Sequence, residues 1–195
     1  IKRGSKVSIA AACFSIYAYK ELKKQLENID ELRFIFTSPT FTTEKTSKAQ
    51  REFYIPRISR ESSLYGTEFE VKLRNELTQK AIAKECADWI RRKVTFKSNV
   101  TQEQMIGFMA VDQTAYMPIN GFSTVDLGCE RGNNAYYPVQ KTENYENSGY
   151  FIKLFEQLWN DKKRLQEVTD IVIENISVAY RENAPEYIYF VALYN

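Results

Sequence analysis

The side chains that could do chemistry in this chain are limited by its composition, because its 195 residues include no histidine. Catalysis by a histidine nucleophile or base, and metal binding through imidazole, are therefore excluded. Asp, Glu, Lys, Tyr, Cys and Ser remain as candidates. The seven glycines form neither a GxxxxGKS/T nor a GxGxxG phosphate loop. We therefore expect no nucleotide site of these two types, no metal and no other cofactor.

The most informative residue order lies between Met105 and Gly128, in the stretch MIGFMAVDQTAYMPINGFSTVDLG. It predicts a strand that ends at an acid, Asp112, then a turn, a second short strand and a Gly-Phe-Ser-Thr segment. An enzyme with a relocated phosphodiesterase site could use Asp112 with Lys97 or Tyr116 as nucleophile and base. Nothing in the sequence brings these three residues together. The residue order from Met105 to Gly128 instead favours a resemblance to a known motif.

This order resembles the motif of the phospholipase D-like nuclease family, HxKx4D followed by a G-S-x-N-F type segment. When Asp112 is aligned with the acid of the motif, Met105 falls at the position of the histidine and Gly107 at that of the lysine. The later segment of the motif then corresponds to Gly121, Ser123 and Thr124.

The resemblance implies a degenerate motif and no catalysis. In the family a histidine attacks phosphorus, a second histidine protonates the leaving oxygen, and lysines hold the phosphate. Met105 offers a thioether, which neither attacks a phosphodiester nor transfers a proton, and Gly107 carries no charge. We therefore expect no turnover of DNA, of bis-p-nitrophenyl phosphate or of phospholipid.

Segments outside the motif extend the resemblance over nearly the whole chain. VSIAAACFSIYAYKELKKQL is similar to the first strand and helix of the family, and ELRFIFTSPTF to its second strand. FIKLFEQLWND and APEYIYFVALYN resemble the segments that lead from such a domain into a Swi/Snf-type helicase motor. The resemblance thus implies the degenerate amino-terminal domain of a DEAD/DEAH helicase protein, with an ATP-dependent motor downstream in the same chain.

The elements that must position these residues alternate between buried strands and amphipathic helices. A strand at Val7–Phe14, a helix from Ile16 and a strand at Leu32–Thr37 predict a βαβ unit. We expect an α/β fold with a phospholipase D-like mixed sheet of about five to seven strands and helices on both faces. Further elements are expected at 70–93 (helix), 94–96, 105–111 and 115–117 (strands), 151–159 (helix capped by Ser148), 165–180 (helix) and from Pro185 (helix).

The expected domain organisation has two parts. Residues 1–148 would form the phospholipase D-like domain, and residues 149–195 a helical extension toward a missing downstream domain. The chain starts at Ile1 rather than Met, and its last stretch has a helical pattern, so we expect a piece of a larger protein. Three sparse cysteines indicate a reducing compartment and thus a cytoplasmic location, and no apolar run is long enough to cross a membrane.

Charge is unevenly distributed and suggests a nucleic-acid contact. Residues 72–97 hold eight basic side chains against three acidic ones, whereas residues 141–195 hold six against nine. A phosphate-facing surface and an ordinary solvated helix face are both consistent with this pattern. The predicted nucleic-acid-binding residues are Lys72, Arg74, Lys80, Lys84, Arg91, Arg92, Lys93 and Lys97, and the cations of a long loop at 38–66 (Lys45, Lys48, Arg51, Arg57 and Arg60) would add to them.

Three functions remain open at this point. The first is a non-catalytic accessory domain that binds DNA or a partner subunit. The second is a structural homodimerisation domain, because members of the family often pair across the active-site face. The third is the enzyme with a relocated site. Salt-dependent binding to duplex DNA separates the first from the second, and residual phosphodiesterase activity lost in Asp112→Ala would support the third.

Overall fold

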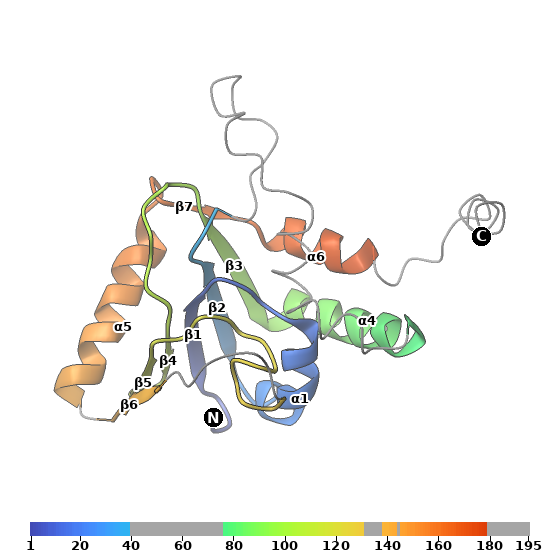
Figure 1. Ribbon diagram of the computed structural model, residues 1–195, viewed down its shortest axis with the longest axis horizontal. Helices are drawn as coiled ribbons and strands as arrows, with labels where there is room; N and C mark the ends of the chain where they lie inside the picture. The colour runs from blue at the N-terminus through green and yellow to red at the C-terminus, as the bar shows by residue number, and fades with distance from the viewer. Residues whose placement is uncertain (40–75, 131–137, 144, 179–195) are drawn as a thin grey trace, which may run out of the picture.

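The computed structural model describes residues 1–39, 76–130, 138–143 and 145–178 (Figure 1). These residues form a seven-stranded mixed sheet in the order β6-β5-β4-β1-β2-β3-β7. The strands are β1 (Lys6–Ala11), β2 (Glu31–Phe36), β3 (Val94–Asn99), β4 (Phe108–Val111), β5 (Thr114–Met117), β6 (Gln140–Thr142) and β7 (Leu165–Glu167). The described helices are α1 (Ile16–Leu26), α4 (Glu76–Lys93), α5 (Tyr145–Asn160) and α6 (Thr169–Val178).

The centre of the sheet is parallel. β1 pairs with β2 from Lys6–Glu31 to Ala11–Phe36, and β2 pairs in parallel with β3. The flanking pairs, β1 with β4, β4 with β5, β5 with β6 and β3 with β7, are antiparallel. We call the side at which β1, β2 and β3 end the carboxyl edge, and the opposite side the amino edge. Because β4 runs against β1, β4 begins at the carboxyl edge.

Helices cover both faces of the sheet. In Figure 1, α5 lies on one side of the strands, and α1, α4 and α6 lie on the other. The larger core lies under the three helices and includes Ile9, Phe34, Phe96 and Trp89. The smaller core lies under α5 and is built from Ala10, Ile35, Phe108, Phe155 and Leu165. β1 and β2 are buried on both of their faces, which explains why their sequences are nearly continuous apolar runs.

The expectation of an α/β fold with a mixed sheet and helices on both faces is confirmed. The start of α1 also follows the sequence pattern, because the Ser15 hydroxyl accepts a hydrogen bond from the Tyr17 N–H and caps the helix. No described helix is long and apolar enough to span a lipid bilayer.

Several predicted boundaries are wrong. The predicted helix at 165–180 begins with a strand instead, because residues 165–167 pair with the end of β3, and α6 starts only at Thr169. Ser148 does not cap a helix, since α5 already begins at Tyr145. The strand predicted from Met105 begins at Phe108, and β1 ends at Ala11 rather than Phe14.

Residues beyond 149 share the sheet of the preceding part of the chain. β7 pairs with β3, and α5 and α6 pack on opposite faces of the sheet. The loop predicted at 38–66 with its five cations, the first residues of the predicted helix at 70–93 and the closing helix from Pro185 lie outside the described residues, apart from residues 38 and 39.

The end of α4 stabilises the end of α1, which leads to a first prediction. Lys93 Nζ donates hydrogen bonds to the carbonyl oxygens of Glu27 (2.6 Å) and Ile29 (2.7 Å), just after α1. Lys93→Met keeps the aliphatic stem but removes both bonds, so we expect the free energy of unfolding to fall by about 1.5 kcal/mol in urea titrations.

The matched control for Lys93→Met is Lys84→Met, on the exposed face of the same helix. Its effect should stay within about 0.5 kcal/mol, as for most surface substitutions. Equal losses in the two variants would contradict the capping role of Lys93.

Candidate functional site

The carboxyl edge of the sheet is the natural place for a site, because ligands of open α/β sheets bind beyond the carboxyl ends of parallel strands. Five of the six motif positions lie there. Gly107 directly precedes β4, whose first residue Phe108 pairs with Ala10 near the end of β1. The segment that follows β5 also lies there, since the Ala12 N–H donates to the Asn120 carbonyl oxygen at 2.8 Å. The structure thus brings Met105, Gly107, Gly121, Ser123 and Thr124 to one edge.

Asp112, the sixth motif position, lies at the amino edge. It occupies the turn between β4 and β5 with a positive φ of 52°. Its carboxylate accepts hydrogen bonds from the Ser5 hydroxyl (2.7 Å) and the Lys6 N–H (3.1 Å). In this structure Asp112 therefore fixes the start of β1.

Gly121 and Phe122 extend the carboxyl edge beside the loop that follows β1. The Phe122 N–H donates to the Cys13 carbonyl oxygen (2.8 Å), and the Ser15 N–H donates to the Phe122 carbonyl oxygen (2.9 Å). The Phe122 ring stacks on Phe14 at a centroid distance of 5.6 Å. A Cβ atom on Gly121 would lie 2.5 Å from Cys13 Sγ and from Asp126 Oδ2, so a larger residue would displace the ends of these two side chains.

Ser123 and Thr124 are buried, and their hydroxyls belong to one local turn. Ser123 Oγ donates to Asp126 Oδ2 at 2.5 Å and accepts from the Asp126 N–H at 3.1 Å. Thr124 Oγ1 donates to Glu130 Oε2 at 3.0 Å. Both side chains therefore have a structural role within residues 123–130.

Gly107, at the position of the family's lysine, has no space for any side chain. A Cβ atom built on it would lie 1.8 Å from the Ile119 carbonyl oxygen and 2.9 Å from that of Ala10. The backbones are held this close because the Ile119 N–H donates to the Gly107 carbonyl oxygen at 2.9 Å. Met105, at the position of the histidine, packs against the smaller core under α5. These two positions contribute packing and no reactive group.

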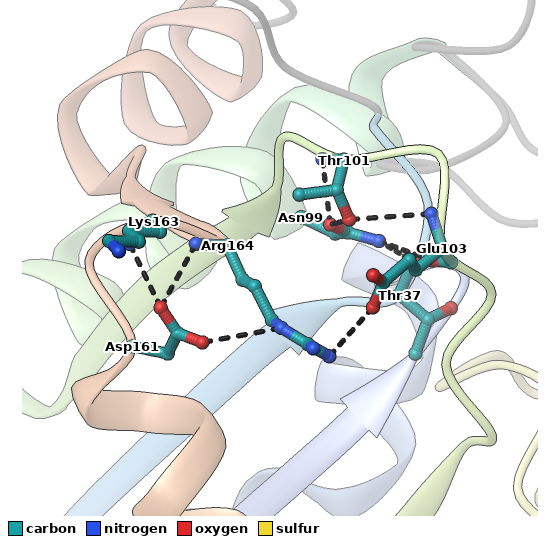
Figure 2. Close-up of polar contacts among 7 residues, drawn as sticks. All are labelled: Thr37, Asn99, Thr101, Glu103, Asp161, Lys163 and Arg164. Atoms are coloured by element: carbon teal, nitrogen blue, oxygen red, sulfur yellow. Dashed lines mark hydrogen bonds and ion pairs between the residues drawn. The ribbon is translucent and has the colours of Figure 1, made fainter.

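Residues 100–107, which we call the strap, lead from β3 across the carboxyl ends of β2 and β1 to β4 (Figure 1). Asn99, fully buried, holds the strap (Figure 2). Its Nδ2 donates to the carbonyl oxygens of Thr37 (3.0 Å) and Glu103 (2.8 Å), and its Oδ1 accepts from the N–H (2.9 Å) and hydroxyl (2.8 Å) of Thr101. All four hydrogen-bonding positions of the amide are used.

A second set of contacts ties the strap to the turn between α5 and β7. Arg164 forms ion pairs with Glu103 of the strap (2.8 Å) and with Asp161 (3.2 Å), as Figure 2 shows. The Val100 N–H donates to the Arg164 carbonyl oxygen at 2.9 Å. Sequence reasoning missed both Asn99 and Arg164. The one available signal was Asn99 followed by Thr101, a spacing typical of a side-chain turn.

The predicted nucleic-acid-binding residues do not form one surface. Lys72 and Arg74 lie outside the described residues, and Lys80 is placed on α4 by its backbone alone. Lys84, Arg91 and Arg92 are exposed on α4, with Arg91 paired to Asp88 (2.7 Å) and Arg92 to Glu27 (3.4 Å). Lys93 binds the carbonyl oxygens at the end of α1, as described above.

The Lys97 side chain lies on the face of the sheet that α5 covers, opposite the face that α4 covers. Its Nζ donates to the Trp159 carbonyl oxygen at 2.8 Å and lies 4.5 Å from the centroid of the Trp159 ring. Lys97 is on β3, whereas Asp112 directly follows β4, and β1 and β2 lie between these two strands in the sheet. Asp112 also lies at the amino edge. The structure therefore does not bring Asp112 and Lys97 together.

Two of the three thiols, those of Cys86 and Cys129, have a raised pKa. Burial raises the pKa of Cys86. The pKa of the exposed Cys129 is raised by partial desolvation and by the charges of Glu21 and Glu130. Reactive thiols instead have a lowered pKa. Among the described residues, no group of three or more Cys, Asp or Glu side chains is placed to hold a metal ion.

An ion pair holds α5 to the sheet and gives the fold a predicted pH dependence. Arg33 on β2 donates to both carboxylate oxygens of Glu156 (2.5 and 3.1 Å), and its guanidinium lies 5.1 Å from the centroid of the Phe155 ring. The hydrogen bonds from Arg33 hold the pKa of Glu156 below its usual value. A carboxyl group with a lowered pKa in the folded state stabilises the fold at neutral pH, and this contribution is lost on acidification.

We therefore expect Glu156→Gln to destabilise the protein by about 1 kcal/mol at pH 7, a value reduced for the partial exposure of the pair. The difference from the wild type should be smaller at pH 3 than at pH 7, because acidification removes the contribution of the Glu156 charge. Urea unfolding at both pH values measures it. A difference that persists unchanged at pH 3 would show that the charge of Glu156 is not what matters.

Comparisons with protein-family models, with curated proteins and with solved structures found no match to this chain.

Proposed function

We propose that this chain is a non-catalytic, phospholipase D-like accessory domain of a larger ATP-dependent helicase-type protein, and that it binds DNA. The observation that carries the non-catalytic part is the packing at Gly107. The Ile119 carbonyl oxygen occupies the space that a lysine side chain would need, and Met105 is partly buried against the smaller core. The carboxyl edge is therefore built around these substitutions, which is what a domain that no longer cleaves phosphodiesters would require.

The exposed face of α4 supports the DNA-binding part. Lys84 and Arg91 lie seven positions apart and so project from the same face of the helix, and both are exposed. Arg91 forms an ion pair with the exposed Asp88, and a surface pair of this kind is weak enough to be exchanged for a phosphate. Lys93 and Lys97 have structural roles, so the proposed contact excludes them.

The test is the salt dependence of binding to a duplex of about 30 base pairs, followed by fluorescence anisotropy. Each lost phosphate contact makes the negative slope of log K against log salt shallower by about 0.9. The double variant Lys84→Gln, Arg91→Gln should therefore reduce the magnitude of the slope by about 1.8. The control, Lys2→Gln with Arg3→Gln, removes the same charge from exposed residues at the chain start and should leave the slope unchanged.

A wild-type domain that fails to bind duplex or single-stranded DNA at about 50 mM salt would refute this function. One observation then favours the alternative of a homodimerisation domain. Ile106 on the strap is 71% exposed, and Val100 at its start is 38% exposed. For that alternative, sedimentation should give a dimer for the wild type and a monomer for Ile106→Glu.

A further inference from the structure

The turn between α5 and β7 holds a second group of cations, Lys162, Lys163 and Arg164, at the carboxyl edge. Leu165 is paired with Asn99, the last residue of β3, so the residues that precede it lie beyond the end of that strand. Arg91 and Lys93 close α4 directly before the start of β3, at the amino edge. The two groups of cations are therefore at opposite ends of the sheet.

The backbone of this turn is fixed. Asp161 Oδ1 accepts hydrogen bonds from the N–H groups of Lys163 (2.9 Å) and Arg164 (3.3 Å), as Figure 2 shows. The Arg164 carbonyl oxygen accepts from the Val100 N–H, which joins the turn to the strap. A fixed backbone lowers the entropy that would be lost when side chains of the turn bind a ligand.

The acidic neighbours of the turn are already paired with Arg164. The Arg164 guanidinium pairs with both Asp161 and Glu103, so neither carboxylate is available to the two lysines. Lys162 and Lys163 are exposed, and no ion pair joins them to another residue in the described part of the chain. The turn thus presents two ammonium groups to solvent, and together with Arg164, Asp161 and Glu103 it carries three positive charges against two negative ones.

We infer that Lys162 and Lys163 contact the phosphate backbone of duplex DNA. This inference rests on the proposed function and deepens it, because it adds a second contact at the carboxyl edge. Two lysines on a rigid turn fit backbone phosphates, which a protein binds without regard to base sequence. The expected binding is accordingly independent of sequence and weakened by salt.

The test uses the same duplex and anisotropy assay. Lys162→Gln with Lys163→Gln should reduce the magnitude of the negative slope of log K against log salt by about 1.8. Lys162→Arg with Lys163→Arg should keep the wild-type slope, because the charges remain. The hydrogen bond from Lys163 to Asp161 is donated by the backbone N–H, so these substitutions leave it in place, and thermal unfolding checks that each variant is folded.

The outcomes separate this inference from the proposed function. If the glutamine variant keeps the wild-type slope while the wild type binds, the inference is wrong and the proposed function stands. The inference is also wrong if Lys2→Gln with Arg3→Gln reduces the slope equally, because the effect would then be one of net charge. If the wild type does not bind DNA at all, the proposed function fails, and this contact fails with it.

Discussion

Gly107→Ala is expected to lower the free energy of unfolding by about 3 kcal/mol or more. The added methyl group would start 1.8 Å from the Ile119 carbonyl oxygen, and a backbone atom cannot move away as the end of a flexible side chain can. At roughly 2–4 °C per kcal/mol for a chain of this size, the melting temperature should fall by about 6–12 °C. Thermal unfolding followed by circular dichroism measures this shift.

Gly149→Ala is the matched control for this prediction. Gly149 lies within α5, and a Cβ atom there would meet nothing within 4 Å. Alanine in a helix is more stable than glycine by roughly 0.5–1 kcal/mol, so this variant should be slightly more stable than the wild type. If Gly107→Ala were as stable as Gly149→Ala, the backbone approach at Gly107 would not be as close as described.

The same clash bears on the proposed resemblance to the phospholipase D-like motif. Met105→His with Gly107→Lys would supply the missing residue types, but the lysine has no space to extend from position 107. We expect this double variant to be destabilised and to show no phosphodiesterase activity. A folded, active double variant would contradict the proposal that the edge has been rebuilt around these two substitutions.

Asn99→Ala is expected to destabilise the protein by about 3 kcal/mol, since it removes all four hydrogen bonds of a fully buried amide. The carbonyl oxygen of Thr37 and the N–H of Thr101 lose their side-chain partner. The strap should also become easier to open, because Asn99 links it to the end of β2. Urea unfolding measures the stability, and amide hydrogen exchange in residues 100–107 measures the opening.

Gln104→Ala is the control for Asn99→Ala, because Gln104 is exposed on the same strap. Its effect on stability should stay within about 0.5 kcal/mol, and exchange in the strap should be unchanged. Similar results for the two variants would mean that Asn99 does not hold the strap.

Sequence patterns predicted those strands and helices whose apolar pattern can be seen within the segment itself. The apolar runs of β1 and β2 and the helical spacing of α1 reflect burial that each segment experiences along its whole length. β7 and β6 have three residues each and exist because a neighbouring strand offers free hydrogen-bonding groups. A pairing partner far away in the sequence leaves no periodic pattern in such a short segment.

The candidate site was predictable to a similar degree. The motif alignment selected positions that the fold does bring to one edge, with Asp112 as the exception. The roles of the residues at this edge depend on contacts between different segments, such as Gly107 with Ile119 and, outside the aligned motif, Asn99 with Thr37. The charge run 72–97 was visible in the sequence, but only the structure separates Lys93, which caps α1, from the exposed Lys84.

The central claim is that this domain acts on DNA by binding it and not by cleaving it. The most direct test is a salt titration of the wild-type chain with a duplex of about 30 base pairs, in which the DNA is recovered and sized afterwards. With about four phosphate contacts, log K should fall against log salt with a slope of about −3.6, and the duplex should remain intact. Absence of binding at about 50 mM salt, or cleavage of the duplex by the protein, would contradict the claim.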